Sequence, residues 1–159
     1  MSLKIIHTAD WHLGQTFFGY DRDEEHEAFL SWLIDILTLR QTDVLLIAGD
    51  VFDVANPSAA AQRRFFRFLR EANRRNPQLQ IVIIAGNHDS AARLEVPIPL
   101  LEELNTSIVG AVPRTDLCKI DFDSLLIPLY NKEGKREAIC LAVPYLRQGD
   151  YPASKEGKD

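Results

Sequence analysis

The chain has 159 residues, and its 18 basic and 23 acidic side chains leave a net charge of −5. A chain of this length can bury a core within one domain, and its 46% hydrophobic and 26% charged residues exclude wholesale disorder. No apolar run approaches the ~18 residues that cross a bilayer, so we expect neither a membrane span nor a secretory signal. The two cysteines, Cys118 and Cys140, lie among apolar residues and are expected to be reduced thiols of a cytoplasmic protein.

Strand and helix patterns alternate through the first half of the chain. Short apolar runs predict strands at Leu3–Ala9, Asp43–Ala48 and Ile81–Ala85. Apolar residues at helical spacing predict helices at Asp21–Arg40, opened by a capping box of Asp21 with Glu24, and at Pro57–Arg75. This order predicts an α/β fold whose parallel strands are joined by right-handed crossovers.

The pattern changes after residue 90. A short helix is predicted at Glu95–Leu104, and strands are predicted at Ser107–Val109, Leu117–Phe122, Leu125–Tyr130 and Ala138–Val143. The segment Asn131–Lys135 has the composition of a hairpin turn between the last two strands. The tail Gly149–Asp159 is polar without an apolar face and is expected to fray.

Polar side chains follow all three strands of the first half. The stretch LLIAGD at 45–50 is echoed by VIIAGN at 82–87, so both strands end in Ala-Gly before an oxygen-bearing side chain. The three strand ends deliver Asp10 and His12, then Asp50, and then Asn87, His88 and Asp89. Each alone has an ordinary explanation, since an Asp after a strand is usually a cap or turn residue. Because ligands of open α/β sheets bind at the carboxyl ends of strands, we expect these groups to converge.

Two carboxylates, an imidazole and a carboxamide around one point form a mixed oxygen and nitrogen ligand set. Such a set suits a borderline divalent ion such as Mn²⁺, Fe²⁺ or Zn²⁺. Asp10 and His12 can face one ion if the chain stays extended, while Asp50 can lie between that ion and a second one at Asn87. Two cations ~3.5–4 Å apart clamp the attacking and leaving oxygens of a phosphoryl displacement. The pattern therefore indicates two-metal phosphoester chemistry.

Three motifs resemble those of the calcineurin-like metallophosphoesterases: D-x-H at Asp10–His12, GD at Gly49–Asp50 and GNHD at Gly86–Asp89. The wider stretches DWHLG at 10–14 and AGDVFD at 48–53 are similar to the bacterial exonuclease branch, whose eukaryotic and archaeal counterparts are double-strand-break-repair nucleases. The resemblance extends from residue 3 to about 147. It implies the N-terminal half of a four-layer α/β/β/α sandwich with a βαβαβ start.

The same resemblance implies a function, cofactors and partners. The function is a metal-dependent DNA nuclease subunit with two divalent ions, Mn²⁺ ahead of Mg²⁺, Fe²⁺ or Zn²⁺. The partners are the DNA substrate, a long coiled-coil ATPase subunit and a second copy in a homodimer. Two alternatives stay open: a phosphatase with the same metal core, and a non-catalytic fragment that only binds a partner or DNA.

The resemblance also assigns roles to individual residues. It implies Asp10, His12 and Asp50 as ligands of the first ion, and Asp50 with Asn87 as ligands of the second. His88 matches the histidine beside the scissile phosphate, and Asp89 matches the acid that orients it.

Three further residues have open roles. Asp53 stands where archaeal relatives have another histidine, and it is either a structural N-cap or a substrate contact. The loop aromatics Phe17 and Tyr20 either stack on the substrate or pack over the first helix.

The family closes its site with a further histidine and a G-H-x-H motif downstream, but this sequence has no histidine after His88. We therefore expect residues 1–159 to be part of a nuclease domain that binds metal weakly and cleaves DNA poorly or not at all.

Two surface features have alternative interpretations. Residues 62–75 carry six Arg and one Glu, and Arg63, Arg67, Arg70 and Arg74 form one stripe along the second helix. This stripe is either a solvated face or a phosphate contact. His26 lies on the polar side of the first helix and is expected to face solvent.

Overall fold

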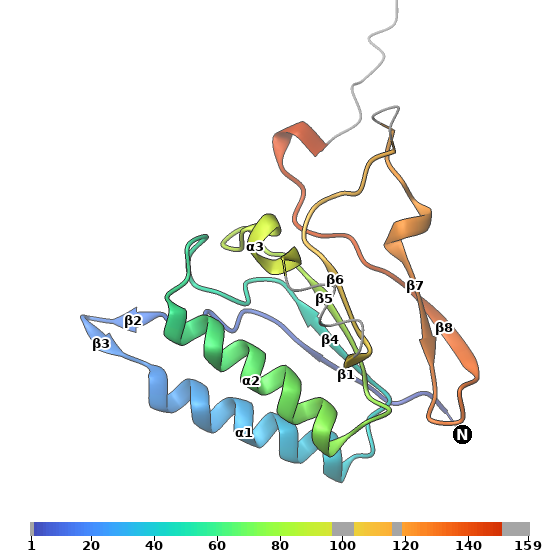
Figure 1. Cartoon of the computed structure of the whole chain (residues 1–159), viewed down its shortest axis with the longest axis horizontal. Helices are drawn as coiled ribbons and strands as arrows, with labels where there is room; N and C mark the ends of the chain where they lie inside the picture. Colours follow the sequence, from blue (N-terminus) through green and yellow to red (C-terminus); the bar gives the residue numbers. More distant parts are fainter. Residues whose placement is uncertain (1, 97–103, 116–118, 151–159) are drawn as a thin grey trace, which may run out of the picture.

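Four parallel strands form the central sheet of the protein, which a computed structural model describes over residues 2–96, 104–115 and 119–150 (Figure 1). The strands lie in the order β1 (Ile5–Thr8), β4 (Val44–Ala48), β5 (Gln80–Ile84) and β6 (Thr106–Val109). The intervening helices are α1 (Asp23–Leu39), α2 (Ala59–Arg75) and the short α3 (Ala91–Glu95). Neighbouring strands are consecutive in this series and all pair in parallel, so the predicted α/β fold is confirmed.

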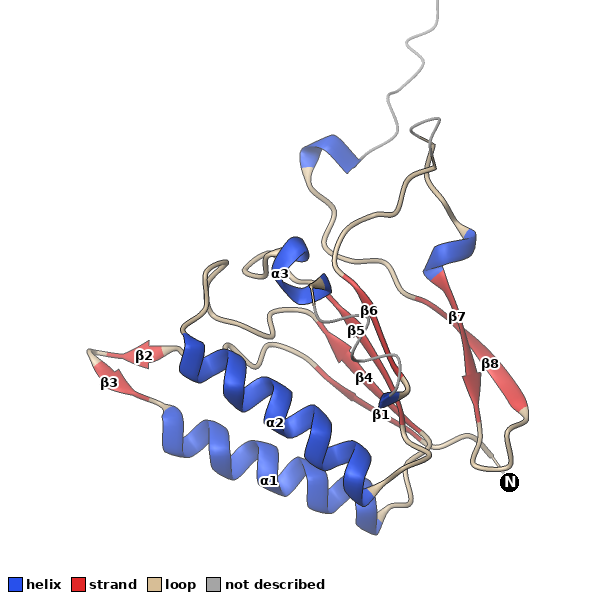
Figure 2. Ribbon diagram, viewed as in Figure 1, coloured by secondary structure: helices blue, strands red, loops and turns tan. Residues whose placement is uncertain are grey.

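Helices α1 and α2 pack side by side on one face of the sheet (Figure 2). Alternate residues of β4 point to opposite faces, as the pleat of a strand requires. Leu45 and Ile47 join the core beneath the helices, whereas Val44 and Leu46 join a second core on the other face. The continuous apolar run of this strand therefore reflects burial on both sides.

An antiparallel hairpin of β7 (Leu126–Tyr130) and β8 (Arg136–Leu141) covers the second face (Figure 1). Leu129 of this hairpin and Ala142 beyond it belong to the same apolar core as Val82 of β5. Helices, parallel sheet and hairpin form three successive layers, as expected for the N-terminal part of the predicted sandwich. The two strands and the turn between them were predicted within two residues of their observed bounds.

The stretch after the first predicted strand contains a small hairpin of β2 (Thr16–Phe17) and β3 (Tyr20–Asp21), which projects past the N-terminal end of α1 (Figure 1). Because Asp21 pairs in β3, the helix begins two residues later. Its N-cap is Arg22, and no side chain makes a capping hydrogen bond there. The predicted capping box of Asp21 with Glu24 is therefore wrong.

Two other expectations from the second half differ from the structure. Helix α3 ends at Glu95, where the predicted helix Glu95–Leu104 begins, and residues 97–103 of that prediction lie outside the described residues. Of the predicted strand Leu117–Phe122, the described part makes only one bridge, from Ile120 to Arg114. Residues 116–118 and 151–159, which include most of the predicted tail, also lie outside the described residues.

Within the described ranges, no helix is long and apolar enough to cross a membrane.

The arginines of α2 neutralise the acids of α1. Helix α1 carries five acidic residues and no Lys or Arg, whereas α2 carries six Arg and one Glu. Arg64 is buried and bonds to Asp23 at 2.8 Å and to Glu27 at 2.9 Å, and Arg67 pairs with Glu27 as well. The acidic residues of α1 thus explain the high arginine content of α2. For the remaining arginines of the stripe, phosphate contact stays a hypothesis.

His26 is only 6% exposed, so the expectation that it faces solvent is wrong. Burial lowers the pKa of its imidazole, and the positive charges of Arg22 and Arg64 lower it further. The folded protein therefore favours the neutral form of this histidine.

Candidate metal centre

Backbone pairing carries the loops after β1, β4 and β5 to one edge of the sheet. The Asp10 N–H donates to Gly49 O at 3.1 Å, and the His12 N–H donates to Asp50 O at 2.9 Å, so the pairing of β1 with β4 continues past both strands. Asp10, Asp50 and Asn87 then line one hollow of about 310 Å³. The structure brings these three side chains together, and their role as ligands stays a prediction.

Three candidate ligands have a left-handed backbone, with φ of 56° at Asp10, 47° at His12 and 47° at Asp50. This conformation costs a non-glycine residue roughly 1–2 kcal/mol and persists only where the surrounding structure enforces it. Trp11, between the first two, is 5% exposed and packs edge-on against Phe68 with ring centroids 5.1 Å apart. The strained loop is therefore anchored in the core.

Two glycines allow the loops after β4 and β5 to touch. A Cβ on Gly49, whose φ is 89°, would lie 3.0 Å from Gly86 Cα. A Cβ on Gly86 would lie 2.1 Å from Asp50 Oδ1 and 2.3 Å from Asp50 N. The repeated Ala-Gly of the two strand ends is thus explained, because any larger residue would push Asp50 away from its place.

Asp89 fastens the two loops together. Its carboxylate is fully buried and accepts hydrogen bonds from the backbone N–H groups of Val51 at 3.1 Å, Phe52 at 3.0 Å and Gly86 at 2.9 Å. These bonds satisfy a buried carboxylate without a cation. No contact in the described part of the chain joins this carboxylate to the His88 ring, which the resemblance expected it to orient.

The His88 ring is held by Asp53 instead. The Nδ1 atom lies 2.7 Å from Asp53 O, and because a carbonyl can only accept, Nδ1 carries the proton. The backbone N–H of His88 donates to Asp50 Oδ1 at 2.9 Å. The hydrogen bond to Asp53 raises the pKa of the His88 imidazole, and the carboxylates of Asp50, Asp53 and Asp89 raise it further. The ring is exposed, and Nδ1 is the nitrogen that the hydrogen bond engages.

The donor set fits a divalent cation. One ligand atom each from Asp10, His12 and Asp50 lie within 4.8 Å of one another. Three ligands about 2.1 Å from a shared ion lie roughly 3.0–3.6 Å from one another, so movements of up to about 1 Å bring all three into range. Asp50 is 8% exposed, and its Oδ2, 4.0 Å from His12 Nε2, has no hydrogen-bond donor among the described residues. A buried carboxylate with a free oxygen beside an imidazole and a second carboxylate suits Mn²⁺, Fe²⁺ or Zn²⁺.

The remaining candidate residues are placed differently. The aromatics of the β2–β3 hairpin, Phe17 and Tyr20, are 65% and 78% exposed and do not pack over α1. They do not line the hollow either. Tyr145 does line it, and its N–H donates to Ala85 O at 2.8 Å. Sequence reasoning missed this residue, whose only signal was its place after the last predicted strand.

The chain belongs to the calcineurin-like phosphoesterase family, whose pattern it matches over residues 3–143. Members of this family are metal-dependent phosphoesterases, and the resemblance found in the three sequence motifs is thereby confirmed.

Relatives of the chain include three bacterial proteins that carry the name of the SbcD subunit of the nuclease SbcCD. The one from Rhodobacter capsulatus is 48% identical over 157 residues, which are 99% of this chain and 38% of the relative. The one from Escherichia coli K12 is 34% identical over 155 residues, which are 98% of this chain and 36% of the relative. The one from Bacillus subtilis is 39% identical over 122 residues, which are 77% of this chain and 31% of the relative. The chain thus spans about a third of the length of these proteins.

Proposed function

We propose that this chain provides the first metal-binding loops of an SbcD-like DNA nuclease subunit that hydrolyses phosphodiesters with two divalent ions, Mn²⁺ before Mg²⁺, Fe²⁺ or Zn²⁺. One observation carries the proposal: Asp10, His12 and Asp50 come from two strand ends, all in left-handed conformations, with ligand atoms within 4.8 Å of one another. Strain gathered on potential ligands is typical of a functional site.

Each residue then has a task. Asp10, His12 and Asp50 would hold one ion, and Asp50 with Asn87 would contribute to a second. When bound, such a pair of ions clamps the attacking and leaving oxygens of a phosphodiester and lowers the pKa of water. Within the part of the chain that the structure describes, the second ion would have only a shared carboxylate and a neutral amide, so we expect weak binding there and slow cleavage by this chain.

His88 would act on the substrate rather than on the metal. Its Nδ1–H is occupied by Asp53 O, which leaves Nε2 to face a phosphate oxygen. An imidazole placed beside the phosphate can stabilise its charge or donate a proton to the leaving oxygen.

The proposed partners follow from the relatives' name and from the exposed hairpin. An SbcC-like coiled-coil ATPase would join the nuclease to DNA, and the full-length protein would form a homodimer. Phe17 and Tyr20 are exposed aromatics that would stack on bases near the site.

Mn²⁺ binding together with a comparison of substrates tests the proposal. We expect the chain to bind Mn²⁺, Asp50→Asn to abolish that binding, and bis-p-nitrophenyl phosphate and DNA to be hydrolysed slowly in preference to p-nitrophenyl phosphate. A preference for the monoester would favour a phosphatase. Mn²⁺ binding with no hydrolysis, even at high protein concentration, would favour a binding fragment. Unchanged Mn²⁺ affinity in Asp50→Asn would contradict the metal centre itself.

A further inference from the structure

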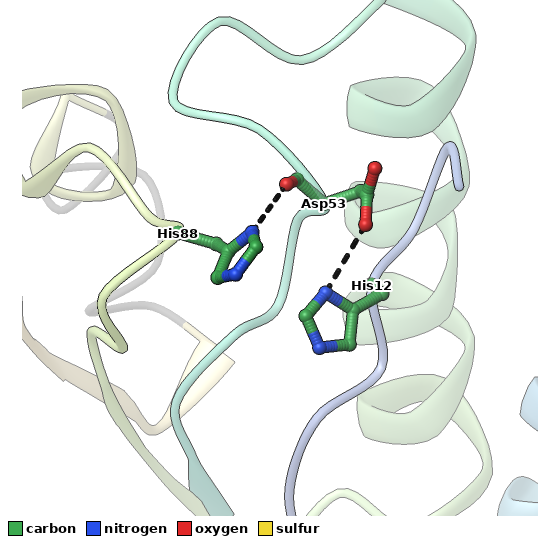
Figure 3. Close-up of side chains that lie close together, drawn as sticks. All are labelled: His12, Asp53 and His88. Atoms are coloured by element: carbon green, nitrogen blue, oxygen red, sulfur yellow. Dashed lines mark hydrogen bonds and ion pairs between the residues drawn. The ribbon is translucent and has the colours of Figure 1, made fainter. Parts of the chain in front are cut away.

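Asp53 lies between the two imidazoles of the candidate metal centre (Figure 3). Its carboxylate Oδ1 is 3.2 Å from His12 Nδ1, and its backbone oxygen is 2.7 Å from His88 Nδ1. The two rings are perpendicular, with centroids 4.9 Å apart. One residue therefore contacts the same nitrogen, Nδ1, of both histidines.

The two nitrogens of His12 have different surroundings. Nε2 faces the Asp50 carboxylate at 4.0 Å, on the side of the candidate ion. Nδ1 is buried, and no aligned hydrogen-bond partner for it exists among the described residues. The Asp53 carboxylate is the acid within reach of that nitrogen, and a small rotation of either side chain aligns them. Because an unpaired buried nitrogen is unfavourable, the pair is expected to close when Nε2 is engaged.

Asp53 is itself held from the other side. Gln15 Nε2 donates to its Oδ1 at 3.3 Å, and Arg22 Nη1 donates to Gln15 Oε1 at 2.7 Å. The backbone N–H of Asp53 donates to Leu13 O at 3.3 Å, within the extension of β1. The carboxylate is thus supported by a chain of polar contacts that starts outside the metal centre.

We propose that Asp53 is a positioning residue that keeps the proton of His12 on Nδ1 and so directs Nε2 to the metal. The inference rests on the proposed function, because it concerns the same site. A carboxylate behind a metal-bound histidine is a general way to fix its tautomer and orientation. In this proposal Asp53 acts through His12 and is not itself a ligand.

The test measures the tautomer of His12 in the metal-free chain and the affinity for Mn²⁺. Long-range ¹H–¹⁵N correlations of the imidazole rings, recorded well above their pKa, report which nitrogen carries the proton. We expect Nδ1–H at His12, a shift toward Nε2–H in Asp53→Ala, and a 10–100-fold loss of Mn²⁺ affinity in that variant. Asp53→Asn keeps an acceptor at Oδ1 and should restore the tautomer and part of the affinity.

Three further variants separate the possible outcomes. Asp123→Asn removes the same charge from an exposed site and should change neither readout. Gln15→Leu removes the hydrogen bond that supports Asp53 and should shift the His12 tautomer in the same direction as Asp53→Ala, but by less. It replaces Asp53→Ala in the test if that variant does not fold. An unchanged tautomer and affinity in Asp53→Ala, while Asp50→Asn loses Mn²⁺, would overturn this inference and leave the proposed function standing. Loss of Mn²⁺ as complete in Asp53→Ala as in Asp50→Asn would make Asp53 a ligand and overturn it as well.

Discussion

Gly86→Ala should damage the metal centre more than any substitution of similar size elsewhere. The added Cβ would lie 2.1 Å from Asp50 Oδ1 and 2.3 Å from Asp50 N, whereas ordinary van der Waals contact begins near 3.4 Å. The carboxylate or its loop must therefore move by about 1.3 Å. A side chain can rotate away, but the backbone nitrogen cannot, so the β4 loop itself is displaced. Overpacking of this kind costs roughly 1–3 kcal/mol of unfolding free energy, and we expect the upper end of that range.

The same displacement should affect metal affinity. A shift of about 1.3 Å is more than half of a metal–oxygen bond of about 2.1 Å, so Asp50 would leave the coordination sphere. Loss of an outer partner alone weakens binding 10–100-fold, and we expect a loss beyond 100-fold for Mn²⁺. Urea unfolding and Mn²⁺ titration followed by electron paramagnetic resonance measure the two effects.

Two other glycines provide matched controls. At Gly110, a Cβ would lie 2.9 Å from Ala91 Cα, so Gly110→Ala should lower stability comparably and leave Mn²⁺ affinity unchanged. At Gly149, nothing lies within 4 Å of an added Cβ, so Gly149→Ala should change neither. If Gly86→Ala kept both wild-type stability and wild-type Mn²⁺ affinity, the described contact between the two loops would be refuted.

Three further substitutions test other parts of the structure. His88→Ala should keep Mn²⁺ content and lower diester turnover by about 10²–10⁴-fold, and loss of the metal would make His88 a ligand. Asp89→Ala should lower the unfolding free energy by about 3 kcal/mol or more in urea, because three buried N–H groups lose their acceptor; a loss no larger than that of Asp123→Asn would contradict this. Because burial lowers the pKa of His26, the unfolded chain binds a proton below about pH 6.5 that the folded chain does not, and the unfolding free energy decreases as the pH falls. His26→Gln should make this decrease smaller. An identical pH slope in the variant would show that His26 does not contribute.

The first three strands of the sheet and their parallel pairing were predictable because local pattern and burial agree in this fold. A strand buried on both faces is apolar at every position, as Val44 to Ile47 are, and such a run is visible without any tertiary information. The carboxyl ends of parallel strands meet at one edge by geometry alone, which is why Asp10, Asp50 and Asn87 were predicted to lie together.

The differences arise where a distant segment decides the outcome. Asp21 has the local features of a helix cap, but it pairs with Thr16 in the β2–β3 hairpin and is not available to α1. His26 occupies a polar helix position, yet it is buried in the fold, and the charge of Arg64 on α2 reaches its imidazole. Helical periodicity describes one helix at a time and contains neither contact.

The polar contacts that support the site could not be predicted from the sequence either. Asp53 meets His12 and His88 across separations of 41 and 35 residues, and only the packing of three loops brings them together. The left-handed backbone at Asp10, His12 and Asp50 has only a weak sequence signal, because Asp and His adopt it more often than other non-glycine residues but are found mostly in other conformations. Sequence motifs identified which residues matter, and the structure distinguishes those that face the hollow from those that hold them.

The central claim is that Asp50 is the shared ligand of a divalent metal centre. Anomalous scattering from crystals of the chain grown with Mn²⁺ tests it most directly. We predict an anomalous peak about 2.0–2.2 Å from an oxygen of Asp50, with Asp10 and His12 in the same coordination sphere. Saturating Mn²⁺ with no peak at this edge of the sheet, or a peak bound by other residues, would contradict the claim.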